Sequence, residues 1–213
     1  MKTDELIGLL AADTAPVPRQ VGERRLVVAL GAGVLLGVAW VLAQFGLRGD
    51  LAQVAGTAPF ALKVAMPLAV AALGAAAVFR LGHPGMRLGA LGVGLGLPVL
   101  LLWVWAVWVW AGADPAQRDS LLWGSTWRVC SINVAITALP MLALALWYLR
   151  GLAPTRPAWA GAAAGWLAGG VGAAAYALHC PETDAPFLAV WYVLGMWVPT
   201  ALGAVIGHRW LRW

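Results

Sequence analysis

Long apolar runs alternate with short polar connections along almost the whole chain. Six runs of 21 to 24 residues stand out, at Leu26–Leu47, Pro59–Phe79, Leu88–Ala111, Val129–Leu149, Ala158–Leu178 and Phe187–Gly207. A helix needs about 20 residues to cross the ~30 Å hydrocarbon core of a bilayer. Only a helix satisfies all its backbone hydrogen bonds within one such segment. The pattern therefore predicts an all-α integral membrane bundle of six transmembrane helices within residues 26–213.

The composition agrees with a membrane protein and leaves little room for a second, soluble domain. Hydrophobic residues make up 62% of the 213 residues and charged residues 11%, against roughly 25% charged residues in a typical soluble domain. The net charge of +5 would also suit a nucleic acid, but the basic residues stand in short connections beside the apolar runs. We therefore expect the lipid bilayer as surroundings and no nucleic-acid partner.

Basic residues are distributed unevenly between the two sides of the predicted bundle. One side, which includes both termini, receives ten of them: Lys2, Arg19, Arg24, Arg25, Arg80, Arg87, Arg150, Arg156, Arg209 and Arg212. The other side receives four: Arg48, Lys63, Arg118 and Arg128. Because short cytoplasmic loops carry the excess of Lys and Arg, the sequence predicts that both termini are cytoplasmic.

Glycines spaced four residues apart recur inside the apolar runs. They form the sets Gly33 and Gly37, Gly92 and Gly96, Gly161, Gly165 and Gly169, and Gly203 and Gly207. This spacing allows helix backbones to approach closely and to gain packing contacts that lipid does not replace. It predicts a compact bundle and indicates no particular function.

The polar segment of residues 1–25 contains one short amphipathic pattern. Acidic residues suited to the first turn of a helix, Asp4 and Glu5, precede apolar residues at helical spacing, which are Leu6, Ile7, Leu9 and Leu10. The pattern ends near Asp13, because prolines follow. Two interpretations stay open: a helix on the membrane surface, or a helix that docks in a groove on another protein. Its acidic character favours docking, since membrane-surface helices are usually basic.

The only two cysteines of the chain fall on the side opposite the termini. Cys130 begins the fourth run and Cys180 follows the fifth. Polar residues are expected around them, chiefly Lys63, Arg128, Asn133 and His179, with Gln44, Tyr176 and Tyr192 at the same depth. Polar groups at membrane depth usually face the bundle interior and by default indicate a functional site.

Three interpretations of the cysteine pair remain open. The pair forms a structural disulfide, which suits an oxidising compartment, or it is a reversible redox or metal sensor, or the cysteines are unrelated. For a metal, Cys130, His179 and Cys180 would supply the ligands, with Glu182 or Asp184 completing the site. For redox sensing, Arg128 would lower the pKa of a neighbouring thiol.

The sequence disfavours catalysis and any cofactor beyond a metal at the cysteines. It has no Cys-x-x-Cys motif, and no acidic residue lies in the middle of an apolar run. A small transporter or channel subunit is the alternative function. It would need a continuous polar path across the bundle, whereas polar residues become rare in the half nearer the termini.

Five stretches resemble a known family. They are Met1-Lys2-Thr3-Asp4-Glu5-Leu6-Ile7 with Leu10-Ala11-Ala12-Asp13, Trp127-Arg128-Val129-Cys130-Ser131-Ile132, Leu149-Arg150-Gly151 with Ala153-Pro154-Thr155-Arg156-Pro157, Ala175-Tyr176-Ala177-Leu178-His179-Cys180-Pro181-Glu182, and Trp191-Tyr192. These stretches look like those of the NrsF-type membrane anti-sigma factors of proteobacteria, and the resemblance covers essentially the whole chain.

The resemblance implies a partner and a regulatory function. In that family the cytoplasmic face holds an extracytoplasmic-function sigma factor at the inner membrane, away from RNA polymerase, and envelope stress thought to involve the two cysteines releases it. Residues 1–25 would be the sigma-binding segment. Leu6, Ile7, Leu9 and Leu10 would make apolar contacts, Asp4, Glu5 and Asp13 would pair with basic groups, and Cys130 and Cys180 would be the sensor. No feature indicates an oligomeric state.

Overall fold

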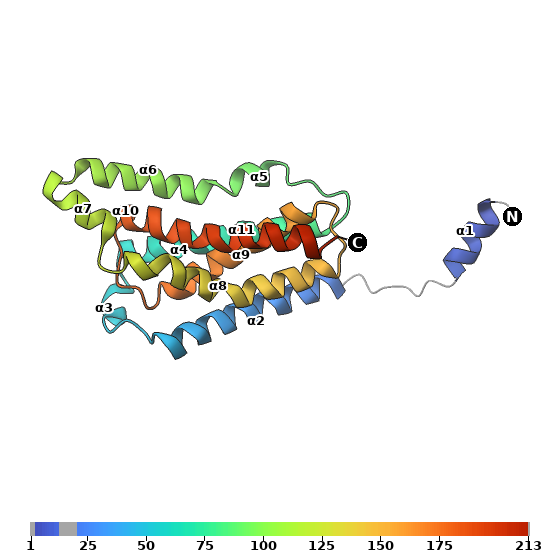
Figure 1. The fold of residues 1–213 in the computed structure, drawn as a ribbon, viewed down its shortest axis with the longest axis horizontal. Coiled ribbons are helices and arrows are strands. Elements are labelled where there is room, and N and C mark those ends of the chain that lie inside the picture. Colours follow the sequence, from blue (N-terminus) through green and yellow to red (C-terminus); the bar gives the residue numbers. More distant parts are fainter. Residues whose placement is uncertain (1–2, 13–20, 213) are drawn as a thin grey trace.

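Helices form every regular element that the computed structural model describes, which covers residues 3–12 and 21–212 (Figure 1). The elements are α1 (Thr3–Ala12), α2 (Val21–Gln44), α3 (Leu51–Val54), α4 (Ala58–Gly82), α5 (Ala90–Gly94), α6 (Leu97–Gly112), α7 (Pro115–Trp123), α8 (Trp127–Arg150), α9 (Pro157–Tyr176), α10 (Ala185–Phe187), the π-helix η1 (Leu188–Tyr192) and α11 (Val193–Trp210). The predicted all-α fold class is confirmed.

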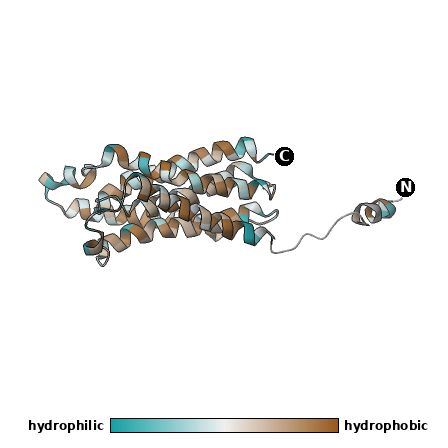
Figure 2. Ribbon diagram, turned by 90° about the horizontal axis from the view of Figure 1, so that it is seen from below, coloured by the Kyte–Doolittle hydropathy of each residue, from teal (hydrophilic) through white to brown (hydrophobic). Residues whose placement is uncertain are grey.

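The long helices lie side by side, and the short ones gather mostly at one end (Figure 1). Helices α3, α7 and α10 lie at the end where α2 finishes and α8 begins, near both cysteines. We call this the cysteine end. At the opposite end, the terminal end, α2 begins and α11 finishes. Hydropathic colouring is mostly apolar along the long helices, with polar residues concentrated towards their ends (Figure 2).

Within the described residues, five helical stretches are long and apolar enough to cross a membrane. They are Gly22–Gln44, Ala58–Gly82, Ala90–Gly112, Pro115–Arg150 and Ala185–Trp210. Five of the six predicted spans overlap them. The remaining prediction, Ala158–Leu178, corresponds to α9, which consists largely of Ala and Gly and does not reach the mean hydropathy of a spanning helix. Six spans and the direction of the termini therefore remain predictions.

Helix α9 lies at the centre of the bundle and packs against α11, α4 and α8. Its glycines make the close approach possible. A Cβ atom on Gly170 would lie 2.7 Å from the Pro67 carbonyl oxygen of α4, and one on Gly172 would lie 2.8 Å from the Val134 carbonyl oxygen of α8. Towards α11, Gly161 and Gly203 face each other's backbone. The predicted glycine contacts thus form here through backbone-to-backbone packing.

Helix α6 lies at the edge of the bundle and packs loosely. Apolar grooves of about 500 and 730 Å³ line two of its sides, one against α10, η1 and α11 and one against α4. The glycine pair predicted to bring this span close to a neighbour does not do so. The nearest atom to a Cβ on Gly92 belongs to Leu88, four residues earlier, and Gly96 ends the break between α5 and α6.

The last of the predicted spans contains a π-helical turn. Helix α10, η1 and α11 follow one another without interruption from Ala185 to Trp210. A π-helical turn holds an extra residue and shifts the side chains that follow it, and such turns frequently occur at functional sites. Here the turn ends at Tyr192, which is fully buried.

Candidate functional site

The two cysteines meet inside the cysteine end of the bundle. Cys130 lies in the first turns of α8, and Cys180 lies in the connection after α9. Both are free thiols with 0% exposure. The Cys130 thiol is a hydrogen-bond partner of the Cys180 sulfur. The structure therefore contains a reduced, buried dithiol, which can form a disulfide without a large movement of either sulfur.

Local packing explains why residues 50 positions apart come together. Gly172 of α9 lies against Val134 of α8, which places the end of α9 beside the start of α8. The chain then turns at the end of α9, because the amides of His179 and Cys180 both donate to the Tyr176 carbonyl oxygen, each at 3.0 Å. This turn points the Cys180 side chain towards α8.

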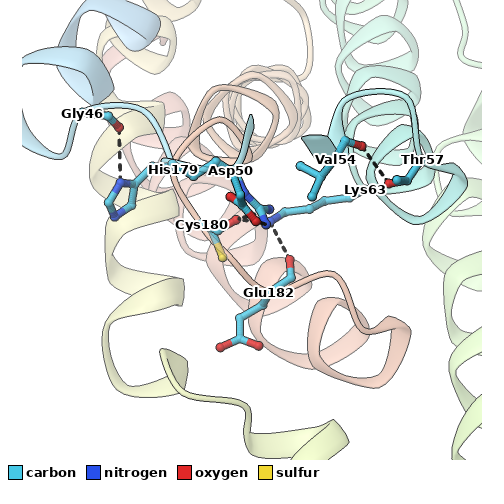
Figure 3. Close-up of polar contacts among 9 residues, drawn as sticks. Gly46, Asp50, Val54, Thr57, Lys63, His179, Cys180 and Glu182 are labelled. Atoms are coloured by element: carbon cyan, nitrogen blue, oxygen red, sulfur yellow. Dashed lines mark hydrogen bonds and ion pairs between the residues drawn. The ribbon is translucent and has the colours of Figure 1, made fainter. Parts of the chain in front are cut away.

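A buried lysine from α4 reaches the connection of residues 177–184 between α9 and α10, which we call the Cys180 segment (Figure 3). Lys63 is 1% exposed. Its ammonium donates to the carbonyl oxygens of Cys180 at 2.6 Å and Glu182 at 2.5 Å. It also contacts the Cys180 sulfur and lies 5.4 Å from the centre of the Tyr192 ring. A buried ammonium is costly unless its protons find acceptors, and here backbone carbonyls and a thiol supply them.

Arg48 holds the same segment from the connection between α2 and α3. Its guanidinium donates to the Cys180 carbonyl oxygen at 3.1 Å, and its amide donates to the Leu178 carbonyl oxygen at 3.1 Å. Two further guanidinium hydrogen bonds, of 2.6 and 2.8 Å, go to the Asp50 carboxylate. The hydrogen bonds from Arg48 hold the pKa of Asp50 below its usual range. The sequence patterns above assign no role to this pair, although an Arg-Gly-Asp sequence directly after an apolar run is a visible signal.

Glu182 connects the Cys180 segment to the start of α8. One oxygen of its carboxylate accepts from the amides of Ser125 and Thr126 at 2.7 and 3.2 Å, and from the Ser125 hydroxyl at 2.6 Å. An anion is favoured beside the free amides of a helix N-terminus. The Glu182 carboxylate points away from Lys63, which contacts only the backbone carbonyl of this residue in Figure 3.

Aromatic and amide side chains close the site on the remaining sides. The Asn133 amide donates to the Tyr176 hydroxyl at 3.0 Å. The Tyr192 hydroxyl is completely buried and, among the described groups, makes no well-formed hydrogen bond, while its polar neighbour is the Cys180 thiol. The Ser131 hydroxyl donates to the Trp191 carbonyl oxygen at 2.8 Å, which ties α8 to the π-helical turn.

The pKa of Cys180, which lies beyond the end of α9, is lowered. The hydrogen bond from the Cys130 thiol is the main cause, and the nearby Lys63 ammonium acts in the same direction, whereas burial raises it. Opposite charge and a hydrogen bond to the sulfur both favour the thiolate. Cys180 is therefore the more acidic member of the pair.

Two residues predicted to support the cysteines lie elsewhere. Arg128 is exposed, and its guanidinium lies 5.3 Å from the centre of the Trp127 ring, so the cation beside the thiols is Lys63 instead. Residues 128 and 130 differ by about 200° on a helix, so they face different sides. The His179 ring faces away from Cys180 in Figure 3 and bonds the Gly46 carbonyl oxygen at 3.2 Å.

The predicted metal ligands do not converge. Among the described residues, no group of three His, Cys, Asp or Glu side chains is arranged to hold a metal ion. His179 packs between Phe45 and Tyr176, with ring-centre distances of 5.2 and 5.7 Å, and joins the end of α2 to the end of α9. The set Cys130, His179 and Cys180 is thus reduced to the two thiols.

The predicted sigma-binding residues lie in α1, away from the cysteines. Asp4 and Glu5 occupy its first turn, and Leu6 and Ile7 are 42% and 59% exposed. Leu9 and Leu10 belong to the same helix, but their side chains are outside the described part, and Asp13 is outside the described residues. A small helix with exposed apolar side chains is available for a partner.

The polar path required by a transporter is not found in the described part of the chain. There, the fully buried polar or charged side chains are Lys63 and Thr137. The Thr137 hydroxyl bonds the Asn133 carbonyl oxygen of its own helix at 2.7 Å. Beyond Thr137, the interior towards the terminal end consists mainly of small and apolar residues, such as Met141 and Ala145, together with the buried Tyr148.

Comparison with known proteins gives a consistent result. The family model described as "NrsF: Negative regulator of sigma F" matches residues 10–213. A probable anti-sigma-F factor NrsF of Azospira oryzae is 40% identical over 213 residues, and the anti-sigma-F factor NrsF of Caulobacter vibrioides is 40% identical over 215 residues. Each match covers the full length of both chains. No solved structure matches the chain.

Proposed function

Because the chain belongs to the NrsF family of negative regulators of sigma F, we propose that it is an anti-sigma factor of the bacterial inner membrane. It sequesters an extracytoplasmic-function sigma factor and releases it when the cysteine pair responds to envelope stress. The observation that carries the proposal is the full-length similarity to two anti-sigma-F factors, together with the buried dithiol.

The membrane location is supported by the five long apolar helices. Many large apolar side chains on them are exposed, such as Leu35 at 71% and Trp108 at 75%, and exposed apolar surface on this scale suits lipid. Helix α9 crosses as the sixth span. Because its neighbours shield α9 from lipid, it does not need large apolar side chains to cross the membrane, and Ala and Gly are sufficient. The ten-to-four distribution of basic residues supports a cytoplasmic location of both termini.

Sigma-factor binding is assigned to residues 1–25. Leu6, Ile7, Leu9 and Leu10 form the apolar contact, and Asp4, Glu5 and Asp13 pair with basic groups of the sigma factor. The exposure of Leu6 and Ile7 supports this assignment. An amphipathic helix in a groove is a common mode of recognition.

Sensing is assigned to Cys130 and Cys180. Formation of a disulfide removes two electrons and two protons from the thiols, which a two-electron oxidant takes up. The redox signal is favoured over a metal because, among the described residues, no group of three His, Cys, Asp or Glu side chains includes the two sulfurs. Coupling requires two arrangements of the bundle that the cysteine state and the sigma factor each bias. The central helix α9 connects the two ends and packs against α4, α8 and α11.

Co-purification tests sigma-factor binding. The full chain, tagged and extracted from its native membrane under reducing conditions, should retain an extracytoplasmic-function sigma factor. Leu6→Asp together with Ile7→Asp should abolish retention without changing the thermal stability of the bundle. Gly8→Ala is the matched control on the same helix, since no atom lies within 4 Å of its added Cβ. Retention that survives the double substitution would exclude α1 from the interface.

A second experiment tests the sensor. Diamide, a two-electron oxidant, should release the sigma factor from the wild-type protein and should fail to release it from Cys130→Ser or Cys180→Ser. Release by cadmium in the absence of an oxidant would favour the metal signal. A double serine variant that still releases the sigma factor normally would contradict a sensor role for the cysteines.

A further inference from the structure

The two cysteines of the pair have unequal electrostatic surroundings, although they touch each other. Cys180 lies against the Lys63 ammonium, which contacts both its sulfur and its carbonyl oxygen. Cys130 lies in the first turns of α8, where the Lys63 ammonium acts on it without a hydrogen bond and the Glu182 carboxylate acts in the opposite direction. A cation stabilises a thiolate and an anion destabilises it. The pair is therefore not symmetric in reactivity.

The helix dipole of α8 would ordinarily work against this asymmetry. A cysteine near a helix N-terminus gains acidity from the free backbone amides. Here the Glu182 carboxylate already occupies that position, with hydrogen bonds to the amides of Ser125 and Thr126. The N-terminus of α8 is thus neutralised by an anion, and it gives Cys130 little stabilisation as a thiolate.

Lys63 is fixed in position by its own surroundings. Its ammonium donates to two carbonyl oxygens of the Cys180 segment, and Arg48 donates to one of the same oxygens. The backbone of α4 next to Lys63 is held by α9, because Gly170 of α9 packs directly against Pro67 and Ala71 of α4. The ammonium cannot move away without losing acceptors that nothing else in the buried site replaces.

From these contacts we infer that Cys180 is the attacking thiol of the pair, that Cys130 is the resolving thiol, and that Lys63 is the positioning residue that makes them unequal. The inference rests on the proposed sensor function and specifies its chemistry. Because both sulfurs have 0% exposure, the oxidant is small, and a hydroperoxide such as hydrogen peroxide fits.

The reaction has two balanced steps. In the first, the Cys180 thiolate attacks one oxygen of hydrogen peroxide and the O–O bond breaks. Cys180 becomes a sulfenic acid, and the leaving hydroxide takes up a proton to form water. In the second, the Cys130 sulfur attacks the Cys180 sulfur, and the S–O bond breaks as the S–S bond forms. The Cys130 proton leaves with the hydroxide as a second water.

Single-cysteine variants of the full chain test the assignment. Purified Cys130→Ser and Cys180→Ser proteins are exposed to hydrogen peroxide and then denatured in the presence of dimedone, which labels sulfenic acids. Mass spectrometry follows the label over time. We expect Cys180 to be labelled roughly tenfold faster than Cys130, the factor that one pKa unit gives at fixed pH. Equal rates, or faster labelling of Cys130, would overturn the assignment.

The role of Lys63 is tested through the pH profile. Cys180 labelling should have its midpoint below that of an ordinary thiol, about 8.5. Lys63→Met should move the midpoint upward and slow labelling roughly tenfold at neutral pH, whereas Lys63→Arg should restore part of the rate. Arg128→Met, which removes an exposed cation at the same end, is the control. Equal effects of the Lys63 and Arg128 variants would contradict the inference.

Titratable and charged groups surround Cys180 from every element that packs on it. The titration of each group contributes to the pH profile of Cys180 labelling. The groups are Arg48 and Asp50 after α2, Lys63 of α4, Cys130 of α8, Tyr176 of α9, Tyr192 of η1 and the neighbouring Glu182. Glu182→Gln leaves Lys63 intact and should speed the labelling of Cys130 in the Cys180→Ser background. If Lys63→Met does not fold, Glu182→Gln still tests whether the charges around the two thiols make their reactivities unequal.

Failure of this inference is distinct from failure of the proposed function. The labelling rates require no sigma factor. Equal reactivity of the cysteines would remove the asymmetry and leave sigma-factor retention unaffected. Conversely, a protein that retains no sigma factor would lose the proposed function and still show the faster Cys180.

Discussion

Helices α9 and α6 have similar lengths and opposite surroundings. In α9, 15 of 20 residues are buried, and most of them are Ala or Gly. In α6, three of 16 residues are buried, although the helix consists mainly of Leu, Val and Trp. Within a membrane bundle, apolar side chains gain little by leaving lipid for protein, whereas small residues allow backbones to come into contact. Burial here follows the small side chains and not the most apolar ones.

The two helices also differ in what they position. Helix α9 carries Tyr176 and leads directly into the Cys180 segment, so its packing against α4 and α8 brings Lys63 and Cys130 to that segment. Helix α6 contacts the last span through the hydrogen bond of 2.9 Å from the Trp103 indole to the Ala189 carbonyl oxygen, and its other polar contacts at this end, at Trp110 and Ala111, go to Arg118 of α7. The candidate site therefore depends on the central helix and only slightly on the peripheral one.

The largest effect is expected from Gly165→Leu in α9. A side chain at this position would collide with the backbone of α11 at Pro199 and Thr200, so the helices must separate. We expect a loss of at least about 3 kcal/mol in the free energy of unfolding, seen as a lowered midpoint in thermal or denaturant unfolding in detergent. Gly92→Leu is the control, because it is exposed and has no close neighbour from another helix. Similar losses for both variants would refute the comparison.

A smaller effect is expected from Glu182→Gln at the cysteine end. The substitution removes the charge that bonds the start of α8, and the site is partly exposed, so a loss of about 1 kcal/mol is expected. The unfolding midpoint of the reduced protein measures it. Asp184→Asn is the matched control, since Asp184 is exposed and makes no capping hydrogen bond to α10. A larger loss for Asp184→Asn would show that Glu182 does not stabilise the start of α8.

Two tryptophans of α6 are expected to differ, by a smaller amount, in their contributions to the free energy of unfolding. Trp103→Phe removes the hydrogen bond to Ala189 and should cost about 1 kcal/mol. Trp108→Phe should change the free energy of unfolding by less than about 0.5 kcal/mol, because Trp108 is 75% exposed. Both are measured by unfolding in the same detergent. If Trp108 proves the more important of the two, α6 has a partner that this single chain does not contain.

The smallest effect concerns pH and the Arg48–Asp50 pair. The pKa of Asp50 is lower in the folded protein, so its stabilising contribution is present above the unfolded pKa of about 3.9 and is lost as the pH falls through the folded value. Asp50→Asn should therefore lower the unfolding midpoint slightly at neutral pH and have no effect in strong acid. Asp119→Asn, an exposed acid on α7, serves as control. A difference that persists in strong acid would exclude the ionic contribution.

Several features of the fold follow directly from the sequence. The apolar runs predict the positions of α2, α4, α8 and the last span, because long apolar segments have few alternatives to a helix in a membrane. The break between α5 and α6 falls beside Gly96 and Pro98, a proline within a predicted span. The glycine pattern predicts close contacts in α9 and α11 and overpredicts them at Gly92, because spacing alone does not say whether a helix faces a neighbour or lipid.

The candidate site was predictable only in part. Lys63, Asn133 and the two cysteines do lie together at one end. Arg128 and His179 were assigned to the same group from depth alone, and depth does not fix the side of the helix on which a residue lies. Arg48 and Glu182 act through hydrogen bonds to distant backbone groups, of Cys180 and of Ser125. No spacing rule connects such positions.

The sequence by itself determined the helical class, the apolar segments and the presence of both cysteines near one end, because these depend on hydropathy and chain length. Family membership also follows from the sequence, through residues matched along almost the whole chain. Only the tertiary structure decided that α9 is central, that α6 is peripheral and that Lys63 bonds Cys180 and not Cys130. These outcomes depend on which helix faces meet, and that is set by backbone contacts between segments far apart in the chain.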